Sequence, residues 1–223
     1  MKALASEVAQ WCGGRLLGAD TLLVGVAQDS RQLPPGSLFV ALRGEQVDGH
    51  DFVEALGARA GAALVERPLP LATTQIVVPD VLAALQALAR AWLATLDLRV
   101  LALTGSNGKT TCKALTAAIL SGVARTHATP GNYNNEIGVP LTVLGLGADD
   151  RFAVVEMGCG KPGDIDELTA IVAPHASVVS NVAPAHLQRL LSVDGVAEAK
   201  AGIYRGLRAN GVAVINADEA YAA

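Results

Sequence analysis

One eight-residue segment constrains the fold more than any other part of the chain. It reads, in order, Thr104, Gly105, Ser106, Asn107, Gly108, Lys109, Thr110 and Thr111. An apolar run, Val100–Leu103, precedes it, and a stretch of good helix formers, Lys109–Ser121, begins within it. A glycine-containing turn between a buried strand and a helix turns backbone N–H groups toward a phosphate. The sequence therefore predicts a phosphate-binding loop in an α/β domain.

The residue types of this loop indicate how it binds phosphate. Its two glycines allow a tight turn, Lys109 can reach the outer phosphates of a nucleotide, and a threonine hydroxyl, most simply that of Thr110, can ligate magnesium. The general Walker pattern has glycine where this chain has Leu103, so the match is to a variant that begins at Gly105. The alternative is an ordinary glycine turn before a helix.

The rest of residues 99–223 repeats the order strand, turn, helix. Further strands are predicted at Ala124–Ala128, Phe152–Met157, Ser177–Asn181 and Val212–Ile215, and helices at Asp164–Val172 and Val193–Leu207. Such alternation predicts a mostly parallel sheet.

Residues 1–80 predict a smaller α/β domain. Short strand-like runs alternate with turns at Leu22–Val26, Ser37–Leu42, Ala62–Glu66 and Gln75–Val78, and helical spacing occupies Met1–Gly14 and His50–Ala60. Asp80 is a suitable N-cap for a helix over residues 81–98, which we expect to connect the small domain to the larger domain at 99–223.

Composition excludes several classes of protein. The formal net charge of -4 argues against a nucleic-acid partner, because neutralising phosphates along a strand requires a basic face. The apolar stretch over residues 81–98 carries Gln86, Arg90 and Asp97, so we expect a core-facing helix and no membrane span.

The three cysteines, Cys12, Cys112 and Cys159, are odd in number and widely spaced. This fits neither a disulfide framework nor a zinc site and favours a reducing cytoplasm. Cys159 is not expected to be a nucleophile, because only Lys161 offers a nearby positive charge in the sequence.

Three polar residues are candidates for catalysis or metal binding. Glu156 closes an apolar strand and His186 follows another, and the carboxyl ends of parallel strands are where α/β sheets bind ligands. Lys200 lies in a predicted helix among small alanines. The alternatives are a solvated strand-end carboxylate for Glu156, a hydrogen-bonded structural histidine for His186, and a surface lysine for Lys200.

Polar loops supply candidates for substrate binding. The segment from Gly131 to Pro140 contains Asn134 and Asn135, whose amides can donate to and accept from a polar substrate. In the first domain, two short motifs could recognise a charged nucleotide: Ser30 and Arg31 after Asp29, and Asp48 with Gly49 and His50. Turn chemistry is the alternative for each of these segments.

Taken together, these motifs resemble those of the Mur ligase family. The resemblance is carried by the phosphate-binding loop, by Glu156 in Val-Val-Glu-Met-Gly, by Ala185-His186-Leu187, and by Lys200 in Ala-Lys-Ala-Gly-Ile-Tyr. It implies an ATP-dependent ligase in which an acyl phosphate forms and is then displaced by an amine. It also implies that Thr110 and Glu156 hold one Mg²⁺, and that His186 and a carbamoylated Lys200 serve a second.

Within the family the chain is similar to the branch that adds D-alanyl-D-alanine to UDP-N-acetylmuramoyl-tripeptide (UDP-MurNAc-tripeptide). Residues 132–140, 157–165 and 181–187 carry this similarity. The alternative is the branch that adds a single amino acid, which typically has a serine-rich turn after the glutamate and an aspartate before the histidine. Residues 1–80 then resemble the UDP-MurNAc-peptide-binding domain, and the implied protein is a cytoplasmic monomer.

The resemblance covers nearly the whole chain but implies further sequence beyond it. The rest of the central domain and a C-terminal domain that helps bind ATP and the dipeptide are expected in a complete ligase. We therefore expect this stretch alone to have little or no ligase activity. The alternative outside the enzymes is a non-catalytic module that binds a nucleotide sugar.

Overall fold

The computed structural model describes residues 1–222 and divides into two compact α/β units. Unit 1 comprises Met1–Thr95 with Val143–Gly145, and unit 2 comprises Leu96–Thr142 and the residues from Leu146 onward. The α/β class predicted from the sequence is confirmed in both units. None of the helices in the described part of the chain has the length and hydrophobicity that a membrane span requires.

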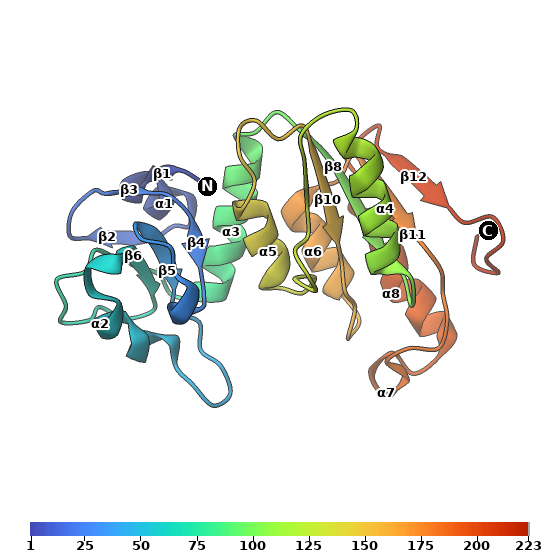
Figure 1. Ribbon diagram of the computed structural model, residues 1–223. Coiled ribbons are helices and arrows are strands. Elements are labelled where there is room, and N and C mark those ends of the chain that lie inside the picture. Colours follow the sequence, from blue (N-terminus) through green and yellow to red (C-terminus); the bar gives the residue numbers. More distant parts are fainter. Residues whose placement is uncertain (223) are drawn as a thin grey trace. The chain divides into compact units, whose positions relative to one another are not determined.

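Unit 1 is built on a five-stranded mixed sheet (Figure 1). The strand order is β2 (Arg15–Leu17), β7 (Gln75–Val77), β6 (Ala60–Val65), β5 (Ser37–Val40) and β4 (Val26–Ala27). Only β2 runs antiparallel to its neighbour, and the other pairs are parallel. The short strands β1 (Ala3–Leu4) and β3 (Leu22–Leu23) form a separate antiparallel pair.

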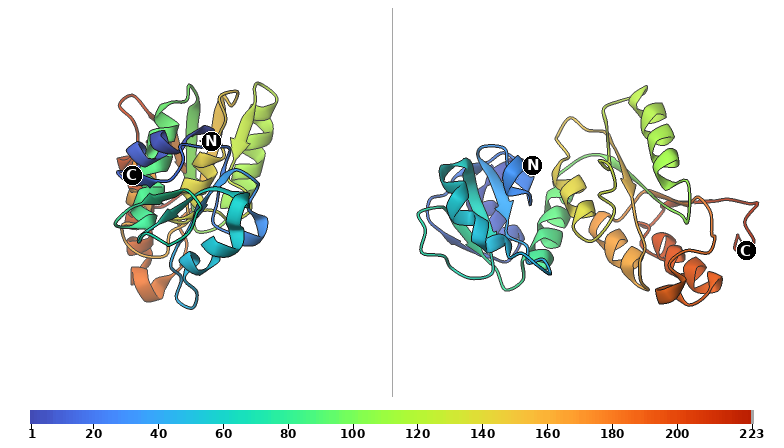
Figure 2. Two further views of the ribbon diagram at one scale, coloured as in Figure 1. Left: turned by 90° about the vertical axis from the view of Figure 1, so that its left-hand side faces the viewer. Right: turned by 60° about the horizontal axis from the view of Figure 1, so that its bottom comes forward.

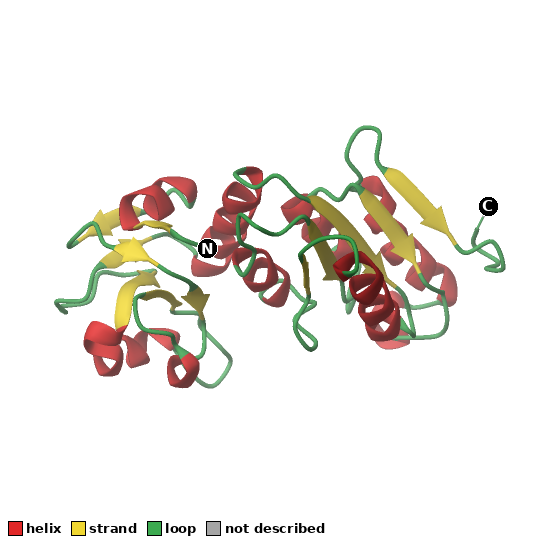
Figure 3. Cartoon of the chain, turned by 45° about the horizontal axis from the view of Figure 1, so that its top comes forward, coloured by secondary structure: helices red, strands yellow, loops and turns green. Residues whose placement is uncertain are grey.

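The helices of unit 1 pack on both sides of its sheet (Figure 3). Helix α1 (Ala5–Trp11) contacts β7 and α3 (Val81–Ala94), whereas α2 (Val53–Leu56) contacts β6. Helix α3 begins where the sequence predicts, because the side chain of Asp80 accepts a hydrogen bond from the backbone N–H of Ala83 at 2.9 Å.

The continuous helix predicted over His50–Ala60 is wrong. This stretch consists of a 3₁₀ turn η2 (Gly49–Phe52), the short helix α2, and a second 3₁₀ turn η3 (Gly57–Arg59). Gly57 has φ = +48°, a backbone conformation that a regular right-handed helix cannot contain. Val53 and Leu56 still pack into the core, which explains the helical spacing in the sequence.

Unit 2 is built on a five-stranded sheet in which every pair is parallel. The strand order is β12 (Val212–Ile215), β11 (Ala176–Val179), β8 (Arg99–Thr104), β10 (Phe152–Glu156) and β9 (Thr126–Ala128). Strand β8 is therefore central, with β10 and β11 on either side. The carboxyl ends of these three strands lie at one edge, which is where parallel sheets bind ligands.

Helices cover both faces of this sheet (Figure 2). Helix α4 (Lys109–Ser121) lies on one face against β9 and β10, and α6 (Asp164–Val172) packs beside α8 (Val193–Arg205) on the other. Helix α4 has the bounds that the sequence predicts. The short helices α5 (Gly138–Leu144) and α7 (Leu187–Leu190) were not predicted.

Candidate functional site

The predicted phosphate-binding loop follows β8 and leads directly into α4. Gly108 is the N-cap of α4 with φ = +75°, and no side chain caps the helix, so its first-turn N–H groups can donate to a ligand. A Cβ at Gly105 would collide with the hydroxyl of Ser180, so this position requires glycine. The structure therefore gives the loop the shape of a phosphate cradle.

The segment after β11 holds the loop in this shape. Asn181 accepts the backbone N–H of Ser106 at 3.0 Å through its carbonyl and that of Asn107 at 2.9 Å through its side chain. The hydroxyl of Ser180 donates to the carbonyl of Asn107 at 2.9 Å, and the hydroxyl of Ser106 donates to the carbonyl of Ala183 at 2.8 Å. Sequence reasoning did not identify Ser180, Asn181 or Ala183 as part of the site.

Lys109 lies over the loop that precedes it. Its ammonium donates to the carbonyl of Gly105 at 2.7 Å and to that of Ser106 at 3.4 Å. The positive charge is thereby held at the helix N-terminus, where an anion binds most favourably.

A cleft of about 460 Å³ opens beside the loop. It brings together Lys109, Asn134, Asn135, His186 and Lys200, which come from separate parts of the sequence. The remaining lining residues are Gly105, Ser106, Glu136, Gly158, Cys159, Gly160, Lys161, Asp164, Glu167, Leu168, Ala185 and Arg189. The cleft thus contains cationic, acidic and amide groups beside the phosphate cradle.

Glu156 lies next to this cleft at the end of β10 and is 2% exposed. One of its oxygens accepts the Thr110 hydroxyl at 3.2 Å and lies 3.0 Å from the ammonium of Lys113. The other accepts the side-chain amide of Asn134 at 2.8 Å. The alternative of a solvated strand-end carboxylate does not fit this burial. Lys113 is the neighbour that sequence reasoning missed.

The Thr110 and Glu156 side chains fit a magnesium ion bound together with phosphates. Both supply hard oxygen donors, and Mg²⁺ is usually held by one or two carboxylates plus substrate phosphates and water. Three donors use three of the roughly four lone-pair sites of the Glu156 carboxylate, so it can still accept a cation. Across residues 1–222 no group of three or more His, Cys, Asp or Glu side chains could hold a metal.

Lys200 lies on α8 and is only 3% exposed, so the surface-lysine alternative is excluded. Burial lowers the pKa of its ammonium from 10.5 to about 8, and the nearby charge of Lys109 acts in the same direction. A lowered pKa increases the fraction of neutral amine, which is the nucleophilic form.

Cys159 also lines the cleft but is not an activated thiol. Burial raises its pKa above the usual value, and the lysine charges of Lys200 and Lys109 oppose this effect only in part. The expectation from the sequence that Cys159 is no nucleophile agrees with this environment.

His186 is an exposed residue at the start of α7 with φ = +51°. It lines the cleft, and its carbonyl accepts the backbone N–H of Arg189 at 2.9 Å. The left-handed backbone at this position is uncommon for a residue other than glycine. His186 therefore lines the cleft from a turn whose backbone conformation is uncommon.

The asparagine-rich segment combines turn chemistry with cleft lining. The side-chain oxygen of Asn135 accepts the backbone N–H groups of Ile137 and Gly138 and so caps the start of α5. Asn134 instead directs its amide to Glu156. Turn chemistry is therefore present on Asn135, and both asparagines line the cleft.

The two motifs of unit 1 form capped turns. Asp29 accepts the backbone N–H of Arg31 at 3.0 Å and pairs with its guanidinium at 2.8 Å, while Ser30 begins the 3₁₀ turn η1 (Ser30–Gln32). The side-chain hydrogen bonds of Arg31 lower the pKa of Asp29 to about 2.

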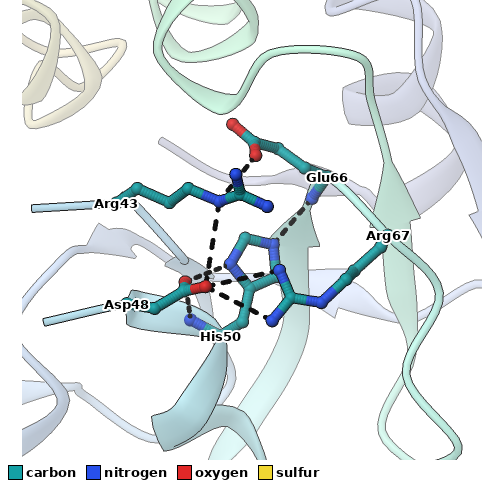
Figure 4. A network of polar contacts seen from close by, with 5 residues as sticks. All are labelled: Arg43, Asp48, His50, Glu66 and Arg67. Carbon is teal, nitrogen blue, oxygen red and sulfur yellow. Dashed lines mark hydrogen bonds and ion pairs between the residues drawn. The ribbon is translucent and has the colours of Figure 1, made fainter.

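The second motif contains a buried histidine (Figure 4). His50 Nδ1 lies 2.6 Å from Asp48, and Nε2 accepts the backbone N–H of Glu66 at 2.8 Å, so Nδ1 carries the proton. A Cβ at Gly49 would lie 2.6 Å from the carbonyl oxygen of Leu42, which explains the glycine. With both nitrogens engaged, His50 can contribute to a substrate site only by shaping the loop, whereas Asp48 is partly exposed.

The missed site residues differ in whether the sequence carries a signal for them. Lys113 lies one helical turn after Lys109 and Thr110, so its spacing could have placed it on the same face of α4. The contacts of Ser180 and Asn181 with the loop depend on the pairing of β11 with β8, which no local signal reveals.

Comparisons with known proteins agree with this arrangement. Residues 103–223 match the family described as "Mur ligase middle domain", and residues 23–93 match "Mur ligase family, catalytic domain". The chain is 46% identical over 215 residues to the UDP-N-acetylmuramoyl-tripeptide--D-alanyl-D-alanine ligase of Escherichia coli, covering 96% of this chain and 47% of that relative.

Solved structures show the same similarity. MurF from Acinetobacter baumannii superposes with a TM-score of 0.92 at 36% identity, covering 100% of this chain and 50% of that one. MurF ligase from Thermotoga maritima, solved in complex with ADP, has a TM-score of 0.80 at 34% identity and covers 87% of this chain and 46% of that one. The chain thus spans about half the length of the curated relatives it matches.

Proposed function

This chain belongs to the Mur ligase family, and from this premise we propose that the protein containing it is an ATP-dependent ligase that joins D-alanyl-D-alanine to UDP-MurNAc-tripeptide. The observation that carries the proposal is the cleft in which the phosphate-binding loop meets Asn134, His186 and Lys200. The similarity to MurF proteins supports the choice of the dipeptide over a single amino acid.

ATP is the proposed ligand of the phosphate-binding loop. The N–H groups at the start of α4 and the ammonium of Lys109 supply positive potential where the β- and γ-phosphates would lie. The Thermotoga maritima relative was solved in complex with ADP, which supports an adenine nucleotide as the ligand.

Thr110 and Glu156 are the proposed ligands of a magnesium ion that accompanies ATP. Their oxygens lie 3.2 Å apart and belong to the chemical class that Mg²⁺ prefers. Bound magnesium would neutralise charge on the outer phosphates and so favour attack by an anionic carboxylate.

His186 and Lys200 are proposed to serve a second magnesium ion near the acyl group. Both line the cleft, and Lys200 would act as a carbamate, formed when its neutral amine adds CO₂ and releases a proton. The modification exchanges a cation that repels Mg²⁺ for an oxygen anion that binds it.

The proposed reaction requires positioning and charge stabilisation more than acid–base chemistry. A carboxylate of the UDP-MurNAc-tripeptide attacks the γ-phosphate of ATP, which gives an acyl phosphate and ADP. The amine of the dipeptide then attacks the acyl carbon, and phosphate leaves as the amide forms. Lys109 can stabilise charge on the transferred phosphoryl group, and Asn134 and Asn135 can orient the polar substrate.

Unit 1 is proposed to bind the uridine diphosphate part of the substrate. Arg31 and Asp48 are the accessible polar groups of the two capped turns, and Ser30, Gly49 and His50 shape the backbone around them.

The proposed setting is the cytoplasm, with the protein acting as a monomer.

Isothermal titration tests the two binding proposals on this chain. We expect UDP-MurNAc-tripeptide to bind both the wild type and Lys109→Ala. We expect Mg²⁺-ATP to bind the wild type and to lose about tenfold or more in affinity in Lys109→Ala, because a charge-assisted contact to phosphate is removed. Equal Mg²⁺-ATP binding by both proteins would contradict the assignment of the loop.

The amine substrate is tested with a complete protein that contains these residues. It is offered D-alanyl-D-alanine with UDP-MurNAc-tripeptide, and single amino acids with the corresponding shorter precursor, while phosphate release is measured. Turnover with the dipeptide supports the proposal, and turnover only with a single amino acid overturns it.

A further inference from the structure

Helix α4 carries an unusual buried residue. Of its described residues only Lys113 is buried, whereas Leu115 and Ile119 on the same helix are 61% and 72% exposed. Lysine is rarely buried unless a partner compensates its charge. Its burial therefore reflects specific contacts and not the packing of an apolar helix face.

Lys113 contacts two separate parts of unit 2. Its ammonium lies 3.0 Å from the Glu156 carboxylate at the end of β10 and donates to the carbonyl of Gly131 at 2.7 Å. Gly131 belongs to the segment of residues 129–137 between β9 and α5, which we call the asparagine loop.

The asparagine loop also reaches Glu156 directly. The Asn134 amide donates to the second oxygen of Glu156 at 2.8 Å, and the carbonyl of Asn134 accepts the backbone N–H of Gly158 at 2.7 Å. The hydroxyl of Thr129 accepts the backbone N–H of Glu156 at 2.9 Å. Lys113, Glu156 and the loop thus form a closed set of contacts beside the cleft.

We infer that Lys113 is a positioning residue that compensates the charge of Glu156 and fixes the asparagine loop against it, so that the proposed magnesium ligand and the cleft-lining asparagines are held in one arrangement. Lys113 itself does not line the cleft, so it acts through Glu156, Gly131 and Asn134. The metal part of this inference rests on the proposed function, whereas the positioning of the loop does not.

Hydrogen exchange of the loop amides tests the positioning role. In the 223-residue chain we expect Lys113→Met to exchange about tenfold faster than wild type in residues 129–137, while β11 keeps its protection. Lys161→Met is the matched control, because Lys161 lines the same cleft but is exposed and does not contact Glu156. Wild-type exchange of the loop in Lys113→Met would overturn the inference.

A second variant keeps the test valid if Lys113→Met does not fold. The double variant Lys113→Met/Glu156→Gln loses the Lys113–Gly131 hydrogen bond without leaving a buried charge unpaired. Its loop exchange is compared with that of the wild type, each relative to the exchange of β11. Faster loop exchange in the double variant supports the inference, and exchange equal to that of the wild type overturns it.

Thermal melting with MgCl₂ alone tests the coupling to the metal. Because Lys113→Met leaves the Glu156 carboxylate without its compensating cation, we expect MgCl₂ to raise its Tm more than that of wild type, and we expect this extra rise to vanish in the double variant. An equal rise in all variants would overturn the coupling and the assignment of Glu156 as a ligand. Faster loop exchange would then still establish the positioning role.

Discussion

The two faces of the parallel sheet in unit 2 each present one buried lysine, and the two lysines have opposite surroundings. On the α4 face, Lys113 forms an ion pair with Glu156 at 3.0 Å. On the α8 face, Lys200 is equally buried, but the structure of residues 1–222 shows no ion pair or hydrogen bond from its ammonium. Its pKa is lowered to about 8 by burial.

This difference separates a lysine with a charge partner from a lysine whose pKa is lowered by burial. A carboxylate partner compensates the charge of a buried lysine, which can then hold other groups in place. A buried lysine without one is more easily deprotonated, which is the property that carbamate formation requires. The predictions below test this contrast and then extend it to unit 1.

The largest effect is expected when the buried pair is broken. Glu156→Gln leaves the ammonium of Lys113 buried without its counter-charge, and we expect a loss of roughly 3–5 kcal/mol in the free energy of unfolding. Urea denaturation measures it. Glu167→Gln, an exposed glutamate on α6, is the control and should change stability by less than about 0.5 kcal/mol. Similar values for the two variants would show that the pair is not structural.

Substitution of Lys200 should have the opposite effect on stability. The pKa of Lys200 is about 8 in the folded protein, against a usual value of 10.5. Between these two pH values Lys200 is protonated in the unfolded chain but largely neutral in the folded one. Wild-type stability therefore rises with pH across this range. Below pH 8, Lys200→Met should therefore be more stable than wild type by roughly 2–3 kcal/mol, an advantage that disappears by about pH 10.5.

Chemical denaturation at pH 7 and at high pH, in buffer free of bicarbonate, measures this advantage. Lys161→Met, which removes an exposed lysine, should show no such pH dependence. An equal advantage of Lys200→Met at both pH values would mean that the amine of Lys200 is not desolvated in the folded protein.

Unit 1 contains a buried histidine, His50, and both of its ring nitrogens have hydrogen-bond partners. His50→Leu removes the imidazole contact of Asp48 and leaves the backbone N–H of Glu66 without its acceptor, and we expect a loss of about 1–3 kcal/mol in stability. Thermal or urea unfolding tests this. His186→Leu is the comparison, because His186 is exposed and its loss should leave stability nearly unchanged. If both substitutions are neutral, the network of Figure 4 does not stabilise unit 1.

The smallest effect is expected at the exposed pair of Asp29 and Arg31. Arg31→Ala should raise the pKa of Asp29 from about 2 toward 3.8, because the guanidinium hydrogen bonds that stabilise the carboxylate are lost. The contribution of these hydrogen bonds is present above pH 3.8 and is lost as the pH falls toward 2. It is small even at pH 7, because the pair is exposed and solvent screens it. An NMR titration of the Asp29 carboxyl carbon measures the pKa, with Arg15→Ala as control. No change in Arg31→Ala would mean that the pair does not form in solution.

Features with local signals could be predicted in both units. The glycines and lysine of the phosphate-binding loop, the bounds of α4 and the Asp80 N-cap depend on a few consecutive residues. The break in the helix predicted over His50–Ala60 could not be predicted from spacing, since Val53 and Leu56 reach the core from a short helix as well as from a long one. Strands β1 and β2 were missed because two or three residues give too little periodicity.

The sequence by itself determined the type of each unit, the position of the phosphate-binding loop and the residue types beside it, because backbone preferences and strand–helix alternation act over short stretches of chain. Only the tertiary structure decided which charged groups meet. Thr110 and Glu156 are separated by 46 residues and come together because β10 pairs with β8. For the same reason, the fold determines that Lys113 has a carboxylate partner and that Lys200 is buried without one among residues 1–222.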